Sequence, residues 1–267
     1  MRNLQSSNPA LRDDVIRGGD WWSDATAGEV ASISGIVNKT GLFAFVLALG
    51  GAGGYALVER YPGLLFPLLI VNLVVSLGCF FMMRGSAIKA RNFGFVYSLS
   101  EGLLLGGVAV MLEGMLAARD IAVPGGLVLQ AFVVTIACLF SMLGLYRAGI
   151  LKGGAMFTRV LTVATIGVIA AVFISFILSL FGLNTMIFNL GAEAGSSGFM
   201  LGFGVTIVLL ILASLWLIVD FRQAEELVKA GAPKETEWYA AFGLIVTIAW
   251  IYFESLKLVY YIALTRE

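Results

Sequence analysis

Apolar residues in this chain are gathered into seven long runs, and polar residues separate each run from the next. A helix that spans a bilayer needs about 20 mostly apolar residues, and each run is close to that length. The runs therefore predict seven transmembrane helices, roughly over residues 41–58, 62–83, 93–117, 126–148, 160–182, 198–221 and 239–263. The expected fold is an all-α integral membrane protein with seven transmembrane helices.

A polar segment precedes the first run, and it is too polar and too acidic for a cleaved signal peptide. We therefore expect two parts, a cytoplasmic polar N-terminal segment over residues 1–38 and a seven-helix transmembrane domain over residues 39–267.

The distribution of Lys and Arg over the short loops predicts the orientation, because these residues are retained on the cytoplasmic side. Thirteen of them lie in the N-terminal segment and in the second-to-third, fourth-to-fifth and sixth-to-seventh loops, whereas the alternate set holds only Arg60, Arg119 and Arg266. We therefore expect the N-terminus inside and the C-terminus outside.

Composition removes several classes of function. The mean hydropathy is +0.95, and Lys plus Arg equals Asp plus Glu at 17 each, so no basic field exists to attract nucleic acid. Histidine is absent, which excludes a Ser-His protease, an HExxH metalloprotease and a His-ligated haem or zinc site. Cys79 and Cys138 lie inside apolar runs, where they suit packing. We expect neither enzymatic activity nor a cofactor.

Inside the apolar runs charges are costly and often functional, and four ionisable residues there are the informative ones: Glu101, Asp220, Glu254 and Lys257. Glu254 and Lys257 are three residues apart on a polar stripe of the last helix. They could form a self-neutralising pair, with the Lys257 ammonium directed outward.

Glu101 and Asp220 each have a structural alternative to a functional role. Ser98 and Tyr97, three and four residues before Glu101, could satisfy its carboxyl group with hydrogen bonds. Asp220 ends the apolar part of WLIVDFRQAEEL, where it could pair with Arg222 or with a lysine of the next loop.

Short motifs spread over nearly the whole chain carry a family resemblance. They are NPAL near the start, VNKTG before the first helix, SEG at 100–102, LYRAG at 145–149, DFRQ at 220–223, and AGAPKETEWYAAFG leading to IYFESLKL. In these motifs the chain resembles the transmembrane Bax-inhibitor-motif family, and within it a prokaryotic YccA-like branch.

The resemblance implies six helices around a central seventh, with a pH-sensitive leak pathway for calcium. It further implies that Asp220, with Gln223 three residues on, faces Glu254 across the pore as sensor and gate. Glu254 stands where the family normally has Asp. Glu101 would line the same pathway.

The spacing between the two acids leaves the partner of Asp220 open. Asp220 and Glu254 are 34 residues apart, and a straight hairpin centred on residue 232 would put Glu254 level with Leu210, about 15 Å from the level of Asp220. Glu101 is therefore the other candidate partner. Two carboxyl groups held together would share a proton, and when ionised they would offer oxygen ligands that suit Ca²⁺.

Three functions follow from these residues. The first is a pH-sensitive calcium leak channel. The second is a non-channel regulator that binds a membrane protease or a stress-response partner through residues 1–38. The third is a retinal-binding protein, with Lys257 as the Schiff-base amine and Glu101 as its counter-ion. Intramembrane aspartyl proteolysis is disfavoured because Asp220 is the only aspartate in any apolar run.

Overall fold

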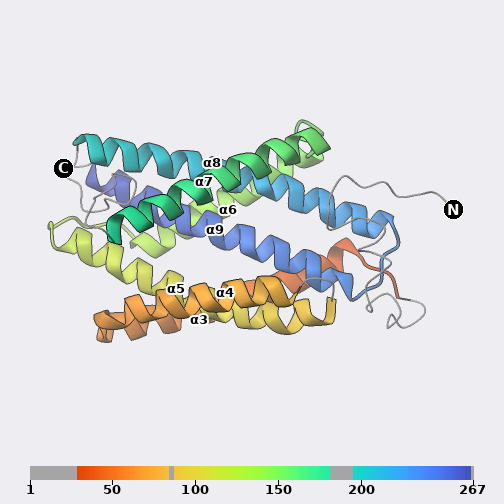
Figure 1. Ribbon diagram of the computed structural model, residues 1–267, viewed down its shortest axis with the longest axis horizontal. Helices are drawn as coiled ribbons and strands as arrows, with labels where there is room; N and C mark the ends of the chain where they lie inside the picture. The colour runs from red at the N-terminus through yellow and green to blue at the C-terminus, as the bar shows by residue number, and fades with distance from the viewer. Residues whose placement is uncertain (1–28, 84–86, 181–194, 266–267) are drawn as a thin grey trace. The chain divides into compact units, whose positions relative to one another are not determined.

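The computed structural model describes residues 29–83, 87–180 and 195–265, and helices make up most of them (Figure 1). Seven of these helices are long and apolar enough to cross a membrane. Their bounds are α3 Ile33–Arg60, α4 Leu65–Met82, α5 Ala87–Ala117, α6 Leu127–Arg147, α7 Ala155–Leu180, α8 Ser197–Lys229 and α9 Thr236–Leu264, with a short 3₁₀ helix, η2 Pro62–Leu64, before α4. The predicted all-α fold with seven membrane-spanning helices is confirmed.

Each apolar run coincides with one helix, but α3 and α8 extend into polar sequence. α3 begins at Ile33 because Ser32 caps it, with the Ser32 hydroxyl accepting from the Gly35 amide at 3.0 Å. α8 continues to Lys229, stabilised by ion pairs one turn apart. The expected boundary at residue 38 therefore falls inside α3, and residues 1–28 of the polar segment lie outside the described residues.

The chain divides into two compact units. The first unit takes the described residues up to Val108 together with Asp220–Val246, and the second takes Ala109–Val219 together with the described residues from Thr247 onward. The division falls within α5, α8 and α9, so each of these helices has one part in the first unit and one part in the second.

In the first unit, α3 and α5 approach each other through glycines. A Cβ atom at Gly50 would lie 2.6 Å from the Leu99 carbonyl oxygen, and Cβ atoms at Gly54, Gly102 and Gly106 would overlap backbone atoms of the facing helix. On each helix two of these glycines are four residues apart, the small-xxx-small spacing that lets membrane helices pack closely. The glycines therefore fix how α3 and α5 cross.

An aromatic cluster joins α3, α5 and α9 within the same unit. The ring of Phe43 lies 5.0 Å from that of Phe95 and 5.5 Å from that of Trp238, and the Tyr97 and Phe242 rings are 5.2 Å apart. Phe43 is completely buried. Edge-on and tilted contacts of this kind add to the packing that burial alone provides.

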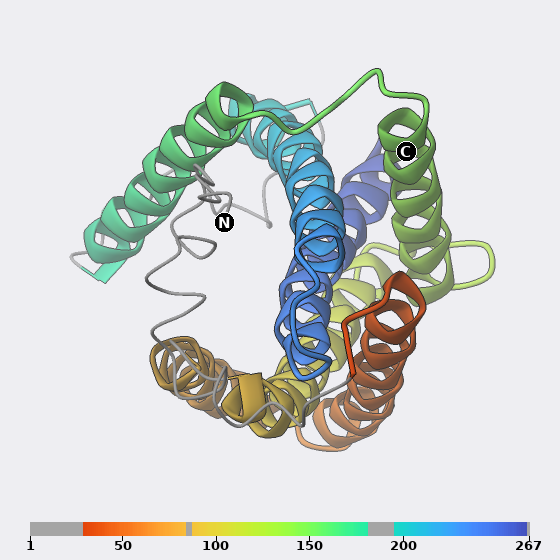
Figure 2. The ribbon, with the colours of Figure 1, turned by 90° about the vertical axis from the view of Figure 1, so that its right-hand side faces the viewer.

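The last turns of α8 and the first turns of α9 form a hairpin in the first unit, drawn in the blue shades of Figure 2. Gly231 takes a left-handed conformation, with φ of 65°, between the two helices. The segment that leads into α3 lies against this turn, since the Ala31 amide donates to the Ala232 carbonyl at 2.8 Å. Residues 29–32 are thereby fixed to the hairpin.

In the second unit, polar side chains connect helices across their apolar surfaces. The Trp216 indole on α8 donates to Thr165 on α7 at 2.8 Å, and the hydroxyls of Thr135 on α6 and Ser255 on α9 are 3.3 Å apart. In the most apolar 18-residue stretch of α9, 50% of the residues are buried, and the share is the same for α8. The corresponding share for α7 is 6%. α8 and α9 therefore have the largest buried shares among the described helices, and the arrangement of six helices around a central seventh stays a prediction.

Candidate functional site

Glu254, in the part of α9 that belongs to the second unit, is the most buried of the predicted acids, with 2% of its surface exposed. The Lys257 ammonium lies 2.7 Å from Oε2 of Glu254. The Trp250 indole N–H donates to Oε1 at 3.3 Å. Both partners lie on α9 itself, one turn to either side, so a single helix face holds both oxygens of the carboxylate.

Lys257 forms the ion pair that its spacing predicts. Its side chain is 16% exposed, and its Nζ lies 4.8 Å from the centre of the Phe253 ring. The ammonium therefore remains on the Glu254 carboxylate and against an aromatic face, where attraction by the ring adds to the ion pair.

Glu101, in the first unit, is held by an amide of the neighbouring helix. The Asn72 side chain on α4 donates from Nδ2 to Oε2 of Glu101 at 3.0 Å, and the Ser100 hydroxyl donates to Oδ1 of Asn72 at 2.8 Å. Because the hydroxyl of Ser100 takes the carbonyl end of the amide, the amino end is left to face Glu101. The three side chains form one oriented chain of hydrogen bonds.

The expectation that Ser98 and Tyr97 satisfy Glu101 is wrong. Ser98 is fully buried and its hydroxyl has no hydrogen-bond partner among the described residues, and Tyr97 packs against Phe242. A helix-face argument considers only neighbours on the same helix, whereas the partner is Asn72. The sequence feature that could have identified this partner is Asn72 itself, a polar amide in the middle of the apolar run LLIVNLVV.

Asp220 is half-buried on α8 at the level of Gly243 on α9. Its Oδ1 lies 3.7 Å from the position that a Cβ of Gly243 would take. This level agrees with a hairpin centred near residue 232, and α9 continues as helix through Gly243. Gln223, also half-buried, follows one turn later on the same face.

The two acids of the expected gate belong to different units, Asp220 to the first and Glu254 to the second. Their pairing stays a prediction, as does a pairing of Asp220 with Glu101. Arg222, named as a partner for Asp220, forms an ion pair with Glu226 on its own helix at 2.6 Å.

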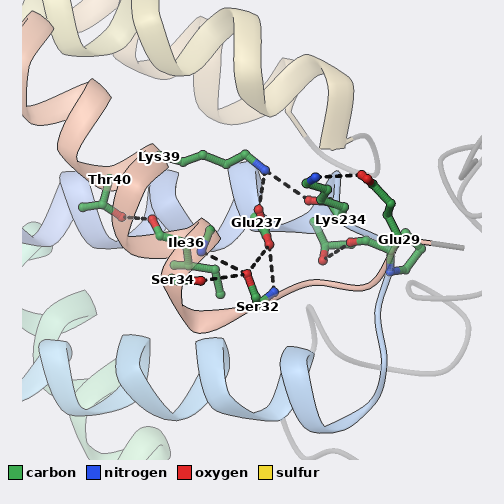
Figure 3. Close-up of polar contacts among 11 residues, drawn as sticks. Glu29, Ser32, Ser34, Ile36, Lys39, Thr40, Lys234 and Glu237 are labelled. Atoms are coloured by element: carbon green, nitrogen blue, oxygen red, sulfur yellow. Dashed lines mark hydrogen bonds and ion pairs between the residues drawn. The ribbon is translucent and has the colours of Figure 1, made fainter.

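A further buried acid, Glu237, joins the start of α9 to the start of α3 in the first unit (Figure 3). Only 1% of its side chain is exposed. It accepts from the Ser32 amide at 2.8 Å and the Ser32 hydroxyl at 3.1 Å, and it pairs with Lys39 at 2.5 Å. The carboxylate also sits at the positive end of the α3 dipole, which stabilises it.

Two more contacts surround this cluster. Lys39 also lies over the Trp238 ring, 5.0 Å from its centre. Lys234 pairs with Glu29 at 2.7 Å, and this hydrogen bond raises the pKa of the Lys234 ammonium above its usual value. The cluster therefore acts as a clamp between chain segments about 200 residues apart in sequence.

Glu113 is another acid of a spanning run that sequence reasoning left aside. It accepts from the Leu127 amide at 3.0 Å, at the start of α6 in the second unit. It thus satisfies one of the free amides at that helix end, and its role is structural.

The described residues contain no group of three or more Cys, Asp or Glu side chains that could hold a metal ion. This finding gives no support to a resident Ca²⁺ site, which needs six or more oxygen ligands. Calcium at Asp220 or Glu254, as a transported or a regulatory ion, stays a prediction.

Comparison with protein families identifies one family for almost the whole chain. The family described as Bax inhibitor 1 like matches residues 7–264. A comparison with the curated proteins found no match.

Proposed function

Because the chain belongs to the Bax inhibitor 1 like family, we propose that it is a pH-sensitive leak channel for calcium or a related cation. It would lie in a prokaryotic plasma membrane with its N-terminus in the cytoplasm. The observation that carries the proposal is Glu254, an acid with 2% exposure inside a membrane-spanning helix. Such residues mark ion pathways more often than lipid-facing surfaces.

The chemistry of the acids supports a cation pathway. Carboxylate oxygens are the ligands that calcium prefers, and acids in channels select cations over anions. Glu254 supplies such a group in the second unit, and Glu101, oriented by Asn72, supplies one in the first. Protonation would remove the negative charge that attracts the ion, which makes the flux depend on pH.

Calcium flux into dye-loaded proteoliposomes tests the proposal. We expect flux between about pH 6 and pH 8 to vary with pH, because protonation of the intramembrane acids removes charge from the pathway. Asp220→Asn and Glu254→Gln should each flatten that variation, because neither amide can ionise. Glu225→Gln is the matched control, since Glu225 is 41% exposed and pairs with Lys229 at a helix end. The proposal fails if wild-type protein passes no calcium at any pH.

The second candidate is a regulator that binds a membrane protease or stress-response partner through its N-terminal segment. The observation that favours it is the clamp, which holds residues 29–32 against the α8–α9 turn and so fixes where the preceding segment leaves the helices. Deletion of residues 1–28 leaves the clamp intact. Lost co-purification with a membrane protease, together with unchanged calcium flux, would favour this function.

A further inference from the structure

The carboxylate that carries the proposed leak already has a cation beside it. The Lys257 ammonium lies 2.7 Å from Oε2 of Glu254, and the Trp250 indole takes Oε1. We propose that Lys257 is a tethered cation that occupies the ion-binding position of Glu254 and so limits the passage of metal ions. This inference rests on the proposed function.

The ion pair and a metal ion compete for the same oxygen. Calcium binds carboxylate oxygens at about 2.3–2.6 Å, so an ion bound to Oε2 of Glu254 competes with Nζ of Lys257, which lies 2.7 Å from that oxygen. A cation that reaches Glu254 must therefore displace the ammonium. Lys257 differs from a free competing ion in that it is tied to the same helix, one turn away, and cannot diffuse out of the pathway.

The surroundings of Lys257 keep it in place. Its side chain is 16% exposed and its ammonium also contacts the face of Phe253, so leaving the carboxylate means losing two attractive contacts in a poorly solvated site. The ion pair of Lys229 with Glu225 has the same chemistry but is exposed at 71% and 41%. Water and salt weaken that exposed pair.

A purely structural pair would respond differently to loss of the lysine charge. If Lys257 only stabilises α9, its removal would lower stability without creating a binding position. If Lys257 stands in for a metal ion, its removal leaves a buried carboxylate that must either take up a proton or bind another cation, and a metal ion then competes only with the proton. Metal binding in the variant is therefore the measurement that separates the two roles.

Terbium luminescence gives that measurement on the full chain in detergent. Tb³⁺ prefers the same hard oxygen ligands as Ca²⁺, and an indole close to the bound ion sensitises its emission. Trp250 donates to the Glu254 carboxylate and is therefore placed to act as the sensitiser. We expect Lys257→Met to bind Tb³⁺ at least about tenfold more tightly than wild type, with Ca²⁺ displacing it.

Matched variants assign the signal. Lys257→Arg keeps the charge and should stay like wild type, whereas Lys257→Met combined with Glu254→Gln should lose the binding. Trp250→Phe in the Lys257→Met background should weaken the emission. Lys229→Met removes a lysine from the exposed pair and should leave the signal of wild type unchanged. If Lys257→Met does not elute as a folded protein, Lys257→Gln, which is polar but uncharged, takes its place in these experiments.

Calcium flux separates failure of this inference from failure of the leak proposal. Lys257→Met should leak faster than wild type at equal pH. Suppose that wild type passes calcium and that a folded Lys257→Met or Lys257→Gln variant binds no more Tb³⁺ and passes calcium no faster. This result overturns the tethered-cation role and leaves the leak proposal standing. A third outcome is that Lys257→Met binds Tb³⁺ tightly but neither this variant nor wild type passes calcium. That outcome supports the cation-binding site at Glu254 and rejects the leak proposal.

Discussion

Glu237 and Glu254 are both almost completely buried, and each is paired with a lysine ammonium. The origin of the lysine differs. Glu254 takes Lys257 from its own helix, whereas Glu237 on α9 takes Lys39 and Ser32 from the start of α3. Loss of Glu237 therefore removes contacts between two helices, whereas loss of the Glu254 pair removes a contact within one helix.

Replacement of Glu237 should measure the strength of the clamp. Glu237→Ala leaves the Lys39 ammonium, 14% exposed, without its carboxylate and leaves the Ser32 amide without its acceptor. Removal of one partner of a buried ion pair costs about 3–5 kcal/mol. We expect a loss of about 3 kcal/mol in the free energy of unfolding, measured by denaturant titration in detergent micelles.

The control for Glu237→Ala is Glu225→Ala, which removes an acid from the exposed pair with Lys229. An exposed pair of this kind is worth about 0–1 kcal/mol. Equal losses of stability in the two variants would mean that the Glu237 cluster does not clamp α3 to α9.

Single residues show where sequence reasoning reached its limit in the candidate site. The Glu254–Lys257 pair follows from helix spacing because both residues lie on one helix. The Asn72 partner of Glu101 and the Ser32 and Lys39 partners of Glu237 come from other helices. Helix spacing gives no information about which helices pack together, so these contacts could not be predicted.

At the scale of helices, hydropathy located every span but not the helix ends. The apolar runs mark the part of a helix that suits hydrocarbon, and caps and ion pairs decide how far the helix continues. Ser32 starts α3 well before its run, and the pairs of Arg222 and Lys229 carry α8 past its run. The small residues of LGGAGGYAL lie in α3, and Gly50 and Gly54 among them let α3 approach α5 closely.

Two glycines of α5 test how much the close approach of α3 contributes. A Cβ at Gly106 would overlap the backbone of α3 around Gly51 and Tyr55, whereas a Cβ at Gly114 would meet no atom within 4 Å. Backbone atoms cannot move aside as side chains do, so Gly106→Ala should lose about 1–3 kcal/mol or more.

Gly114→Ala makes the same exchange on the same helix without a clash. It should be neutral or slightly stabilising, because alanine favours helix over glycine by about 1 kcal/mol. Melting temperatures of the two variants in one detergent provide the comparison. If Gly106→Ala and Gly114→Ala have the same melting temperature, α3 and α5 do not touch along these glycines.

At the scale of the whole molecule, the asymmetric distribution of Lys and Arg over the loops predicts which ends of the helices face the cytoplasm. The clamp around Glu237 includes Lys39 and Lys234, two of the thirteen cations predicted to lie inside. If the prediction holds, the clamp and the turn between α8 and α9 face the cytoplasm. A leak sensitive to pH would then respond to cytoplasmic acid through Asp220, which lies on α8 about three helical turns before that turn.

Cysteine labelling in spheroplasts checks this orientation. In a background with Cys79→Ala and Cys138→Ala, single reporters are placed at two exposed loop positions, Ala118→Cys after α5 and Lys152→Cys after α6. Because loops alternate sides along seven spans, a cytoplasmic N-terminus puts residue 118 outside and residue 152 inside. A membrane-impermeant maleimide should label Ala118→Cys in intact spheroplasts and Lys152→Cys only after permeabilisation. The reverse pattern would put the clamp outside and make external pH the variable that the leak senses.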